Sequence, residues 1–408
     1  MEIKKSVLVL GINCFPELTG IGKYSGEMVK WFAENGHRTT MVTTPPYYPN
    51  WKVQPPYSGK WYLKEEPAEN LTIYRCPLYV PSAPTGLKRM IHEMTFFLSA
   101  FFVVFKLLFH KKHDVIMAIA PPFHLGFLAL FYRFFKGGKI VYHIQDLQIE
   151  AAKELKMLKP WMFGLLFSLE RIIMQRVNVI STISEGMKRK IQAKISRPIT
   201  LFPNWVDTES YYPVASRHSL KKMWGFLPED KLVLYSGSIG EKQGLDSILR
   251  IAKKLSSHER LKFIICGTGP FKEKLQQMAA QMELRNLSFL PLQPNEVFND
   301  FMNIADLHLV LQKGDASDLV MPSKLTTILS VGGLALVTAN AGTSLYEVIE
   351  THYLGLAIPP DDELLLQNAI LEATVEDHSL RRDNARGYAE AFLNRENILK
   401  RFLYEDLI

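Results

Sequence analysis

Short apolar stretches alternate with helix-length segments along the chain, and the pattern restarts in the second half of the 408 residues. The candidate strands are 7–12, 39–44, 71–76, 115–120, 139–144, 177–182 and 199–204, followed by 232–237, 262–267, 287–291, 307–311, 334–339 and 355–360. Strands that alternate with helices form parallel sheets whose two faces are covered by helices. The sequence therefore predicts an α/β protein with two Rossmann-like domains.

The boundary between the predicted domains lies in 201–214, which contains two prolines and several turn-forming residues. A chain of this length usually folds into two or three domains. We therefore expect a first domain of 1–205 and a second domain of 206–390. Because such sheets bind ligands at the carboxyl ends of their strands, we expect a ligand between the two domains.

The composition is that of a globular chain, since 47% of the residues are hydrophobic and the formal net charge is only +7. Cys14, Cys76 and Cys266 are far apart and form no CxxC pair, which favours a reducing compartment over a zinc site. The polar loop after the first apolar run is unlike a signal peptide. No basic and aromatic pattern typical of nucleic-acid binding is present, so we expect no nucleic-acid partner.

Three segments of the first half are unusually apolar, at 94–109, 122–135 and 161–174. The first is interrupted at Lys106 and is shorter than the roughly 20 residues that span a bilayer. Two interpretations remain open: crossover helices packed on the sheet, or helices in a membrane interface, where basic residues are attracted to anionic lipid. The basic residues near these segments are Lys88, Arg89, Lys106, Lys111, Lys112, Arg133, Lys136 and Lys139.

The loop after the first predicted strand carries Gly20 and Gly22 just before an amphipathic helix. Free backbone N–H groups and the helix dipole favour phosphate or carboxylate at such a position. Pro16 and the glycine spacing do not match a dinucleotide-binding fingerprint, and the loop is not a P-loop. The alternative interpretation is that these glycines serve only the backbone geometry of a first turn.

Three loops of the second half have glycine or small residues at successive strand ends. They contain Gly237, Gly240, Gly244, Gly267, Gly269, Ser323 and Lys324. Together they predict a floor for a diphosphate and a base, whereas each loop alone is a weak signal. Lys242, in the first of these loops, is placed to neutralise a phosphate, although a solvated surface lysine is the alternative interpretation.

Pieces of sequence along the whole chain match a known family. They are GINCFPELTGIGKYSGEM, TTPPYYPNW, YRCPLYVP, HIQDLQIEAA, STIS, LFPNW, YSGSIGEKQGL, PSKLTTILSVGG and ENILKRF. On these pieces the chain resembles the family 4 glycosyltransferases of the GT-B fold, and especially those of colanic-acid type. The resemblance implies two Rossmann-like domains facing across a cleft, with a nucleotide-sugar donor in the second and an acceptor in the first. It also implies a last helix, 391–408, that packs back on the first domain, and transfer with retention at the anomeric carbon.

The chain departs from the family pattern in two respects. Leu319 and Thr327 stand where many relatives carry two glutamates eight residues apart, and the usual Gly-Arg of the donor domain reads Gly237-Ser238. Ribose and phosphate binding therefore cannot depend on those side chains, and we assign the phosphate to Lys242 and Lys324. The predicted donor-binding residues are Gly20, Gly22, Gly237, Ser238, Lys242, Gly267, Gly269, Ser323, Lys324 and Thr327.

His143 ends a predicted strand and Asp146 follows three residues later, so both are expected at the carboxyl edge of the first sheet. We assign both residues to catalysis. The resemblance suggests that His143 contacts the transferred sugar or the reacting region, and Asp146 is placed to orient His143 or to bind the acceptor, although HIQD is equally consistent with a capped turn. A histidine satisfied by local hydrogen bonds is the alternative interpretation. We expect neither metal nor cofactor, because preorganised N–H groups and lysines suffice to stabilise a leaving diphosphate. The predicted acceptor-binding residues are Glu17, Lys23, Tyr47 and Tyr48.

The resemblance favours GDP-fucose as the donor, with a UDP-linked amino sugar such as UDP-N-acetylfucosamine second. The implied acceptor is a saccharide on polyprenyl diphosphate in exopolysaccharide or capsule assembly. We therefore expect a cytoplasmic hexosyltransferase bound peripherally to the anionic inner face of the cell membrane. Two other functions remain open on the same fold: a non-hydrolysing nucleotide-sugar epimerase, which needs no acceptor, and a non-catalytic scaffold in a polysaccharide assembly complex.

Overall fold

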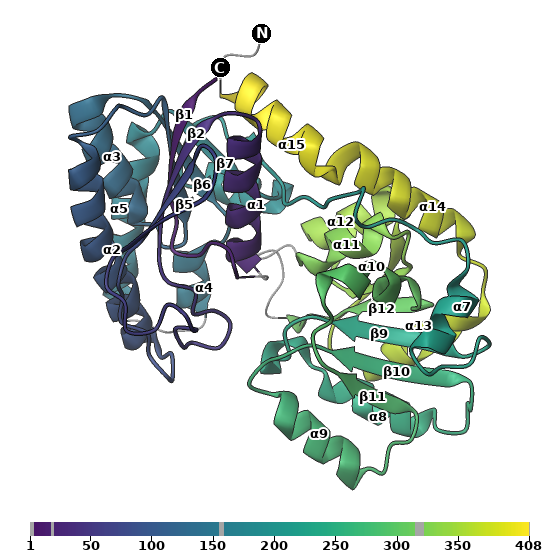
Figure 1. Cartoon of the computed structure of the whole chain (residues 1–408). Coiled ribbons are helices and arrows are strands. Elements are labelled where there is room, and N and C mark those ends of the chain that lie inside the picture. The colour runs from purple at the N-terminus through teal and green to yellow at the C-terminus, as the bar shows by residue number, and fades with distance from the viewer. Residues whose placement is uncertain (1–3, 18–19, 155–158, 315–321, 408) are drawn as a thin grey trace. The chain divides into compact units, whose positions relative to one another are not determined.

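The computed structural model describes residues 4–17, 20–154, 159–314 and 322–407, and the chain divides into two compact units. The first unit comprises Met1–Pro203 together with Leu399–Ile408, and the second comprises Asn204–Ile398. Each unit is built on one sheet with helices around it (Figure 1), which confirms the predicted class of fold. The helix expected over 391–408 is divided, because only its last part, from Leu399, belongs to the first unit.

The sheet of the first unit has eight strands in the order β3-β4-β2-β1-β5-β6-β7-β8. The strands are β1 (Ser6–Leu10), β2 (Arg38–Thr43), β3 (Leu63–Ala68), β4 (Leu71–Arg75), β5 (Val115–Ala120), β6 (Lys139–Ile144), β7 (Val179–Thr182) and β8 (Thr200–Leu201). Every residue of β1 and β5 is buried, as their continuous apolar sequences require. The chain winds outward in one direction from β1 and in the other from β5. The carboxyl edge between β1 and β5 is therefore the switch point where such folds bind ligands.

The edge strand β3 is an exception to the all-parallel sheet that the sequence predicts. It runs antiparallel to β4, and Asn70, with a φ of +64°, lies in the turn that joins them. Its sequence LKEEPA is mostly exposed and charged. Charges and a proline on an edge strand discourage pairing with other chains. No apolar alternation marks such a strand in a sequence, which is why the pattern does not predict it.

One helix of the first unit contains most of the apolar segment 94–109. The helices of this unit are α1 (Gly20–Glu34), α2 (Gly86–Leu107), α3 (Leu125–Lys136), α4 (Gln148–Glu154), α5 (Pro160–Arg176) and α6 (Glu185–Gln192). One face of α2 buries Phe96, Ala100 and Val104, while Leu98 and Phe102 of the other face are exposed. By length and composition α2 is the one helix among the described residues apolar enough to cross a membrane, although 39% of its most apolar window is buried. It is thus a crossover helix whose outer face is also apolar.

The end of the chain is attached to the first unit by specific contacts. The ring of Phe402 stacks on Phe202 with 3.7 Å between centroids. Nε2 of His37 lies 2.8 Å from the Tyr404 hydroxyl, and Nζ of Lys139 donates to the Leu407 carbonyl at 2.7 Å. His37 and Lys139 lie at the amino ends of β2 and β6, so these two contacts are made at the edge of the sheet opposite to the expected ligand edge.

The sheet of the second unit has six parallel strands in the order β11-β10-β9-β12-β13-β14. The strands are β9 (Lys231–Ser236), β10 (Leu261–Cys266), β11 (Leu287–Leu290), β12 (Leu307–Val310), β13 (Ala335–Thr338) and β14 (Gly355–Ile358). One helix, α7 (Arg217–Met223), precedes β9. The helices after β9 are η1 (Glu241–Gln243), α8 (Asp246–Lys254), α9 (Lys272–Gln281), α10 (Asn295–Asn303), α11 (Lys324–Ser330), α12 (Ser344–Thr351), α13 (Glu363–Val375), α14 (Ser379–Tyr388) and η3 (Ala389–Leu393). The boundary between the units falls within α15 (Arg395–Arg401), and η4 (Phe402–Asp406) belongs to the first unit.

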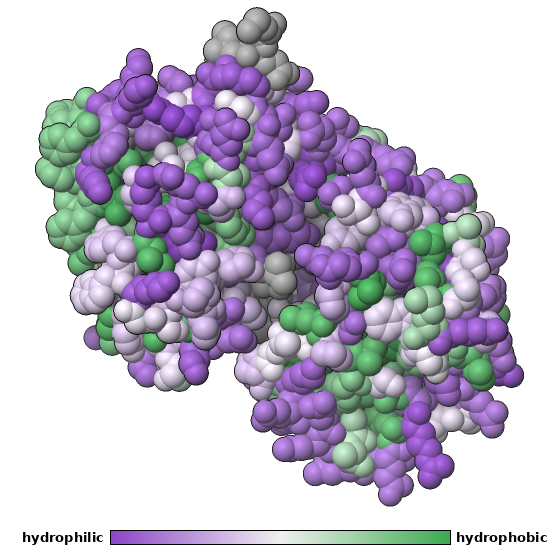
Figure 2. Space-filling model, in the orientation of Figure 1, coloured by the Kyte–Doolittle hydropathy of each residue, from purple (hydrophilic) through white to green (hydrophobic). Residues whose placement is uncertain are grey.

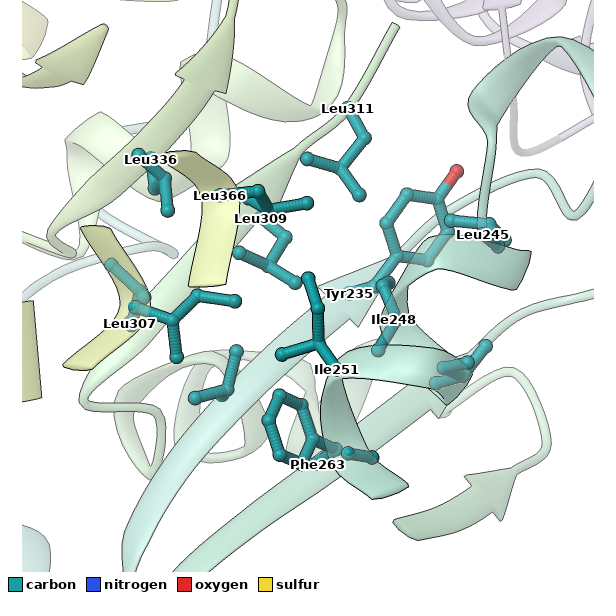
Figure 3. Close-up of a cluster of buried hydrophobic side chains, with 14 of the residues drawn as sticks. Tyr235, Leu245, Ile248, Ile251, Phe263, Leu307, Leu309, Leu311, Leu336 and Leu366 are labelled. Carbon is teal, nitrogen blue, oxygen red and sulfur yellow. The ribbon is translucent and has the colours of Figure 1, made fainter. Parts of the chain in front are cut away.

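Helices cover both faces of this second sheet, so each face has its own core. Figure 3 shows the core that faces α8, where Phe263 of β10 and Leu309 of β12 meet Ile251. Alternate residues of the same strands, such as Leu234 and Ile264, pack in the opposite core. Burial of each large side chain contributes about 1.5–3 kcal/mol. These two cores fix the strand ends whose loops form the candidate site.

Candidate functional site

The glycine loops at the carboxyl ends of β9 and β10 pack against each other. The N–H of Gly237 donates to the Cys266 carbonyl at 2.9 Å, and that of Ile239 donates to Thr268 at 2.8 Å. A Cβ at Gly267 would lie 1.9 Å from the Gly237 oxygen, and one at Gly269 would lie 2.2 Å from the Ile239 oxygen. The sequence analysis assigned the space beside these two glycines to a ligand. In the structure the neighbouring loop of the chain fills that space.

We expect Gly267→Ala to destabilise the second unit by about 3 kcal/mol or more, because the backbone must move to admit the methyl group and φ is +153° there. Gly387→Ala is the matched control, since a Cβ at that helical glycine meets no atom within 4 Å. The control should stabilise the helix by about 0.5–1 kcal/mol. Urea unfolding of the two variants measures both effects. Equal stability of the two variants would contradict the close packing of the loops.

Lys324, the first residue of α11, places its ammonium group against the glycine loop. Nζ lies 3.6 Å from the centroid of the Tyr235 ring and 3.0 Å from where a Cβ on Gly237 would be. Part of the residue is accessible, but Nζ itself is buried and has no hydrogen-bond partner among the described residues. Burial lowers the pKa of Lys324 to about 7. A buried cation without a hydrogen bond is costly, so this position is suited to an anionic ligand.

Three other predicted donor-binding residues of the second unit differ in their surroundings. Ser238 is exposed, and its carbonyl accepts a hydrogen bond from the Tyr235 hydroxyl at 2.6 Å. Ser323 precedes α11 and its carbonyl accepts from the Thr326 hydroxyl at 2.9 Å. Thr327 is 6% exposed. Leu319 lies outside the described residues, and the side chain of Lys242 is likewise not described.

Glu17, predicted to bind the acceptor, instead joins two loops of the first unit. Its Oε1 accepts from the backbone N–H groups of Tyr47 and Tyr48, both at 2.9 Å, and its Oε2 accepts from the Asn13 side chain at 2.8 Å. The carboxyl group is buried, which raises its pKa, while the two backbone hydrogen bonds lower it. Because both oxygens are used within the protein, Glu17 fixes the loops after β1 and β2 in place.

The glycines at the start of α1 differ in what they do. Gly20 has a φ of +58° and space around it, so it serves the turn into the helix. A Cβ at Gly22 would lie 2.7 Å from Oε2 of Glu17, so this glycine makes room for the carboxylate. Nζ of Lys23 lies 5.5 Å from the centroid of the Tyr24 ring. The contact between Gly22 and Glu17 supports the interpretation that these glycines serve the backbone geometry of the loop.

Arg75, which the sequence analysis did not predict, donates hydrogen bonds to the same two loops. Its side chain is fully buried at the end of β4. It donates to Glu65 at 2.6 Å, to the Thr44 carbonyl at 3.1 Å and to the Phe15 carbonyl at 2.9 Å. The one signal for it in the sequence is an arginine directly after the apolar strand LTIY.

Aromatic side chains gather between the loop after β2 and the first turns of α2. The Tyr47 and His92 rings are 4.7 Å apart, and Trp51 lies 5.6 Å from Tyr47 and 5.3 Å from His92. The guanidinium of Arg89 lies 5.3 Å from the Trp51 ring. Tyr47 thus belongs to a cluster with Trp51, Arg89 and His92, three residues that the sequence analysis did not assign to a binding site. Burial raises the pKa of Tyr47 and of Tyr48.

His143 is buried in the first unit, with 1% of the residue exposed. Its Nδ1 lies 3.0 Å from the Ser181 hydroxyl, and its ring centroid is 5.0 Å from that of Phe202. Burial lowers the pKa of His143 to about 3, although the hydrogen bond with Ser181 raises it. Asp146 is partly exposed just beyond the same strand. The surroundings of His143 are those of a neutral histidine satisfied by local hydrogen bonds.

We expect His143 to make the first unit less stable in weak acid. Its pKa of about 3 in the folded state is below the ordinary 6.5, so its contribution is complete above pH 6.5 and is lost as the pH falls toward 3. Between pH 7 and pH 5 this loss is about 2 kcal/mol for one histidine. Urea unfolding at both pH values measures it. His143→Gln should reduce the pH dependence by that amount, and an unchanged dependence would contradict a neutral buried imidazole.

Among the residues that the structure describes, no group of three or more His, Cys, Asp or Glu side chains is arranged to hold a metal ion.

Comparison with known proteins finds relatives over the whole chain. Residues 19–205 match the family described as Glycosyl transferase 4-like domain, and 216–390 match Glycosyl transferases group 1. The chain is 39% identical over 407 residues to WcaI of Escherichia coli (strain K12), a glycosyl transferase whose name refers to colanic acid biosynthesis. That alignment covers 97% of this chain and 98% of the relative.

Two solved structures superpose on nearly the full length. Sucrose-phosphate synthase from Thermosynechococcus elongatus has a TM-score of 0.75 at 15% identity, with 99% of both chains covered. WaaG, a glycosyltransferase involved in lipopolysaccharide biosynthesis, has a TM-score of 0.69 at 15% identity, with 97% of this chain and 98% of WaaG covered. At these identities the superpositions show a common fold.

Proposed function

Because the chain belongs to the family 4 glycosyltransferases of the GT-B fold and is a hexosyltransferase, we propose that it moves a sugar from a nucleotide-diphosphate donor to a saccharide on polyprenyl diphosphate. The product is a repeat unit of an exopolysaccharide or capsule, by analogy with the name of WcaI. GDP-fucose is the favoured donor and a UDP-linked amino sugar is the second. The reaction takes place at the cytoplasmic face of the cell membrane.

The observation that carries this proposal is the buried ammonium of Lys324 beside the glycine loops of the second unit. Among the residues that the structure describes the group has no hydrogen-bond partner, and burial penalises its charge. A donor diphosphate would supply both the charge and the acceptor oxygens that the ammonium lacks. It would also develop negative charge as the sugar leaves, and a fixed cation stabilises that charge without reorganisation.

Thermal shift with GDP, UDP and ADP tests donor binding. A ligand that binds the folded state raises its stability by RT ln(1 + [L]/Kd), so the preferred nucleotide should give the largest rise in Tm. Transfer is then assayed with the sugar nucleotide of that base and a polyprenyl-diphosphate saccharide. No shift with any nucleotide at millimolar concentration would contradict the proposal. Nucleotide binding with isomerisation of the donor in the absence of acceptor would identify an epimerase instead.

We further propose that transfer proceeds with retention at the anomeric carbon and needs no metal. The preorganised N–H groups and the lysine take the place of a metal at the diphosphate. Product NMR reports the anomeric configuration, and an inverted product would exclude retention. Turnover should be the same with and without EDTA, and restoration of lost activity by a divalent cation would contradict this part of the proposal.

An apolar surface on the first unit supports the proposed location of the protein at the membrane. It consists of phenylalanines of α2, α3 and the residues just after α2, and we call it the aromatic patch. Its members are Phe101, Phe102, Phe105, Phe109, Phe131, Phe134 and Phe135, which contact one another in a chain of rings. Phe109 is 78% and Phe134 is 83% exposed. Figure 2 shows hydrophobic residues gathered along the edge of the first unit where α2 and α3 lie in Figure 1.

Basic residues lie beside the aromatic patch in the sequence, and they include Lys106, Lys111 and Lys112. Insertion of the rings and attraction of the cations to anionic lipid would act together. We expect flotation with anionic vesicles at low salt and release at high salt. Phe102→Ser with Phe134→Ser should abolish flotation, whereas Phe392→Ser, on the second unit, is the matched exposed control. A wild-type protein that never floats would favour a soluble acceptor.

A further inference from the structure

The aromatic cluster of the first unit lies at the ligand edge of its sheet. The loop after β2 supplies Tyr47 and Trp51, and the first turns of α2 supply Arg89, His92 and Glu93. α2 follows β4 and leads into the parallel strand β5, so its amino-terminal turns lie at the carboxyl edge. This edge contains the switch point between β1 and β5, where ligands of such sheets bind.

Trp51 is held in an unusual conformation by this cluster. Its φ is +49°, a left-handed conformation that is unfavourable for a bulky side chain. The contacts with Tyr47 and His92 and with the Arg89 guanidinium keep its ring in place. The residue remains partly accessible. A strained residue fixed by its neighbours, with part of its ring open to solvent, is typical of a binding position.

Two polar groups of the cluster are not fully used within the protein. Nδ1 of His92 lies 2.6 Å from the Tyr79 carbonyl and therefore carries the proton, which leaves Nε2 as an acceptor. His92 is 2% exposed, and its Nε2 is buried without a hydrogen-bond partner among the described residues. Burial lowers the pKa of His92, so the ring stays neutral.

Glu93 is the second such group. Its Oε1 accepts from the side-chain amide of Gln148 at 2.6 Å, which leaves Oε2 for a further donor. Burial raises the pKa of Glu93 to about 7. Glu93 and Asn13 both lie near the Tyr47 hydroxyl: the charge of Glu93 raises the pKa of Tyr47, and the hydrogen bond with Asn13 lowers it. The cluster thus offers three kinds of surface together: an aromatic ring, hydrogen-bond acceptors, and the exposed guanidinium of Arg89 as a donor.

We propose that Trp51, Arg89, His92 and Glu93 form the subsite for the terminal pyranose of the acceptor saccharide. The proposal rests on the proposed function, since it identifies which part of the acceptor the first unit recognises. The partly positive C–H groups of a pyranose face pack on an indole ring, whose face is negative. Sugar hydroxyls donate to Glu93 Oε2 and His92 Nε2, and another accepts from Arg89. A few polar groups among aromatic rings are the usual composition of a small-molecule site.

The neighbouring surface suits the rest of such an acceptor. On α2, exposed apolar residues continue from Leu87 and Ile91 through Leu98 to Phe102 of the aromatic patch. A saccharide held at the first turns of α2 would therefore have its lipid carrier beside an apolar helix face.

Saturation-transfer NMR with methyl glycosides of glucose, galactose, mannose, fucose and N-acetylglucosamine tests the subsite directly. At millimolar concentration, at least one glycoside should receive saturation from the wild-type protein. Trp51→Leu should reduce that signal about fivefold or more, the equivalent of losing an aromatic contact of about 1 kcal/mol. Glu93→Gln should also reduce it. Trp61→Leu is the matched control, because Trp61 lies in the same loop and is 76% exposed, and its signal should equal that of the wild type.

The folding of each variant is checked by Tm and by the nucleotide-induced thermal shift, which depends on the second unit. Trp51→Phe keeps a ring and should retain an intermediate glycoside signal. Absence of a signal from every glycoside, or a full signal in Trp51→Leu, would overturn the subsite. If nucleotides still shift Tm in that case, only the subsite fails. If glycosides bind but no nucleotide does, the proposed function fails while the subsite stands as a saccharide-binding site.

Discussion

Replacing Lys324 by Met is expected to lower kcat/KM for sugar transfer by about 10²- to 10³-fold, the usual effect of removing one preorganised group that stabilises developing charge. Methionine has a similar length and leaves the contact with the Tyr235 ring available. Steady-state transfer with the identified donor measures the effect. Lys274→Met is the matched control, because Lys274 is an exposed lysine of the same unit, and it should change kcat/KM by less than about twofold.

The same substitution should make the ligand-free protein more stable. The folded pKa of Lys324, about 7, lies below the ordinary 10.5. Its charged form is thus penalised in the folded state, and this penalty increases as the pH falls from 10.5 toward 7. Lys324→Met removes it, so Tm at pH 7 should rise while activity falls. A fall in both would indicate that the lysine is structural and would contradict its assignment to phosphate.

The largest loss of stability is expected from Arg75→Met. The guanidinium is fully buried and has three partners, which are Glu65 and two backbone carbonyls. Removal of a buried charged group with three partners costs about 3–5 kcal/mol, because the two carbonyls and Glu65, whose side chain is 29% exposed, all lose a hydrogen bond. Urea unfolding measures the change in the free energy of unfolding of the first unit.

Lys64→Met is the matched control for this substitution. Lys64 lies on the neighbouring strand β3 and pairs with Glu66, but both side chains are more than half exposed. Its replacement should lower the free energy of unfolding by less than about 1 kcal/mol. Arg75→Lys should not restore stability, because lysine cannot reach three acceptors in the planar geometry of a guanidinium. Full stability of Arg75→Lys would show that only the charge matters there.

The sequence predicts the fold well where burial alone decides the structure. The continuous apolar runs of β1 and β5 can only be central strands, and they imply the parallel sheet around them. β3 could not be predicted in this way, since an exposed edge strand has no apolar pattern. The two units follow from the restart of the strand–helix alternation.

The candidate site was only partly predictable for a different reason. Lys324 was found because a lysine at the start of a helix beside glycine loops is a local pattern. The role of Glu17 depends on two N–H groups some thirty residues away, and the surroundings of Trp51 depend on a helix farther along the chain. Such pairings are products of the tertiary fold, and no spacing in the sequence indicates them.

The attachment of Leu399–Ile408 to the first unit has a consequence for how the protein is made. The ribosome completes the second unit before it releases the residues that finish the first. Until then the ring of Phe202 lacks its contact with Phe402, and the imidazole of His37 lacks its contact with Tyr404. The first unit is thus completed only after the second has been synthesised, and a chain truncated before Leu399 would lack the segment that completes it.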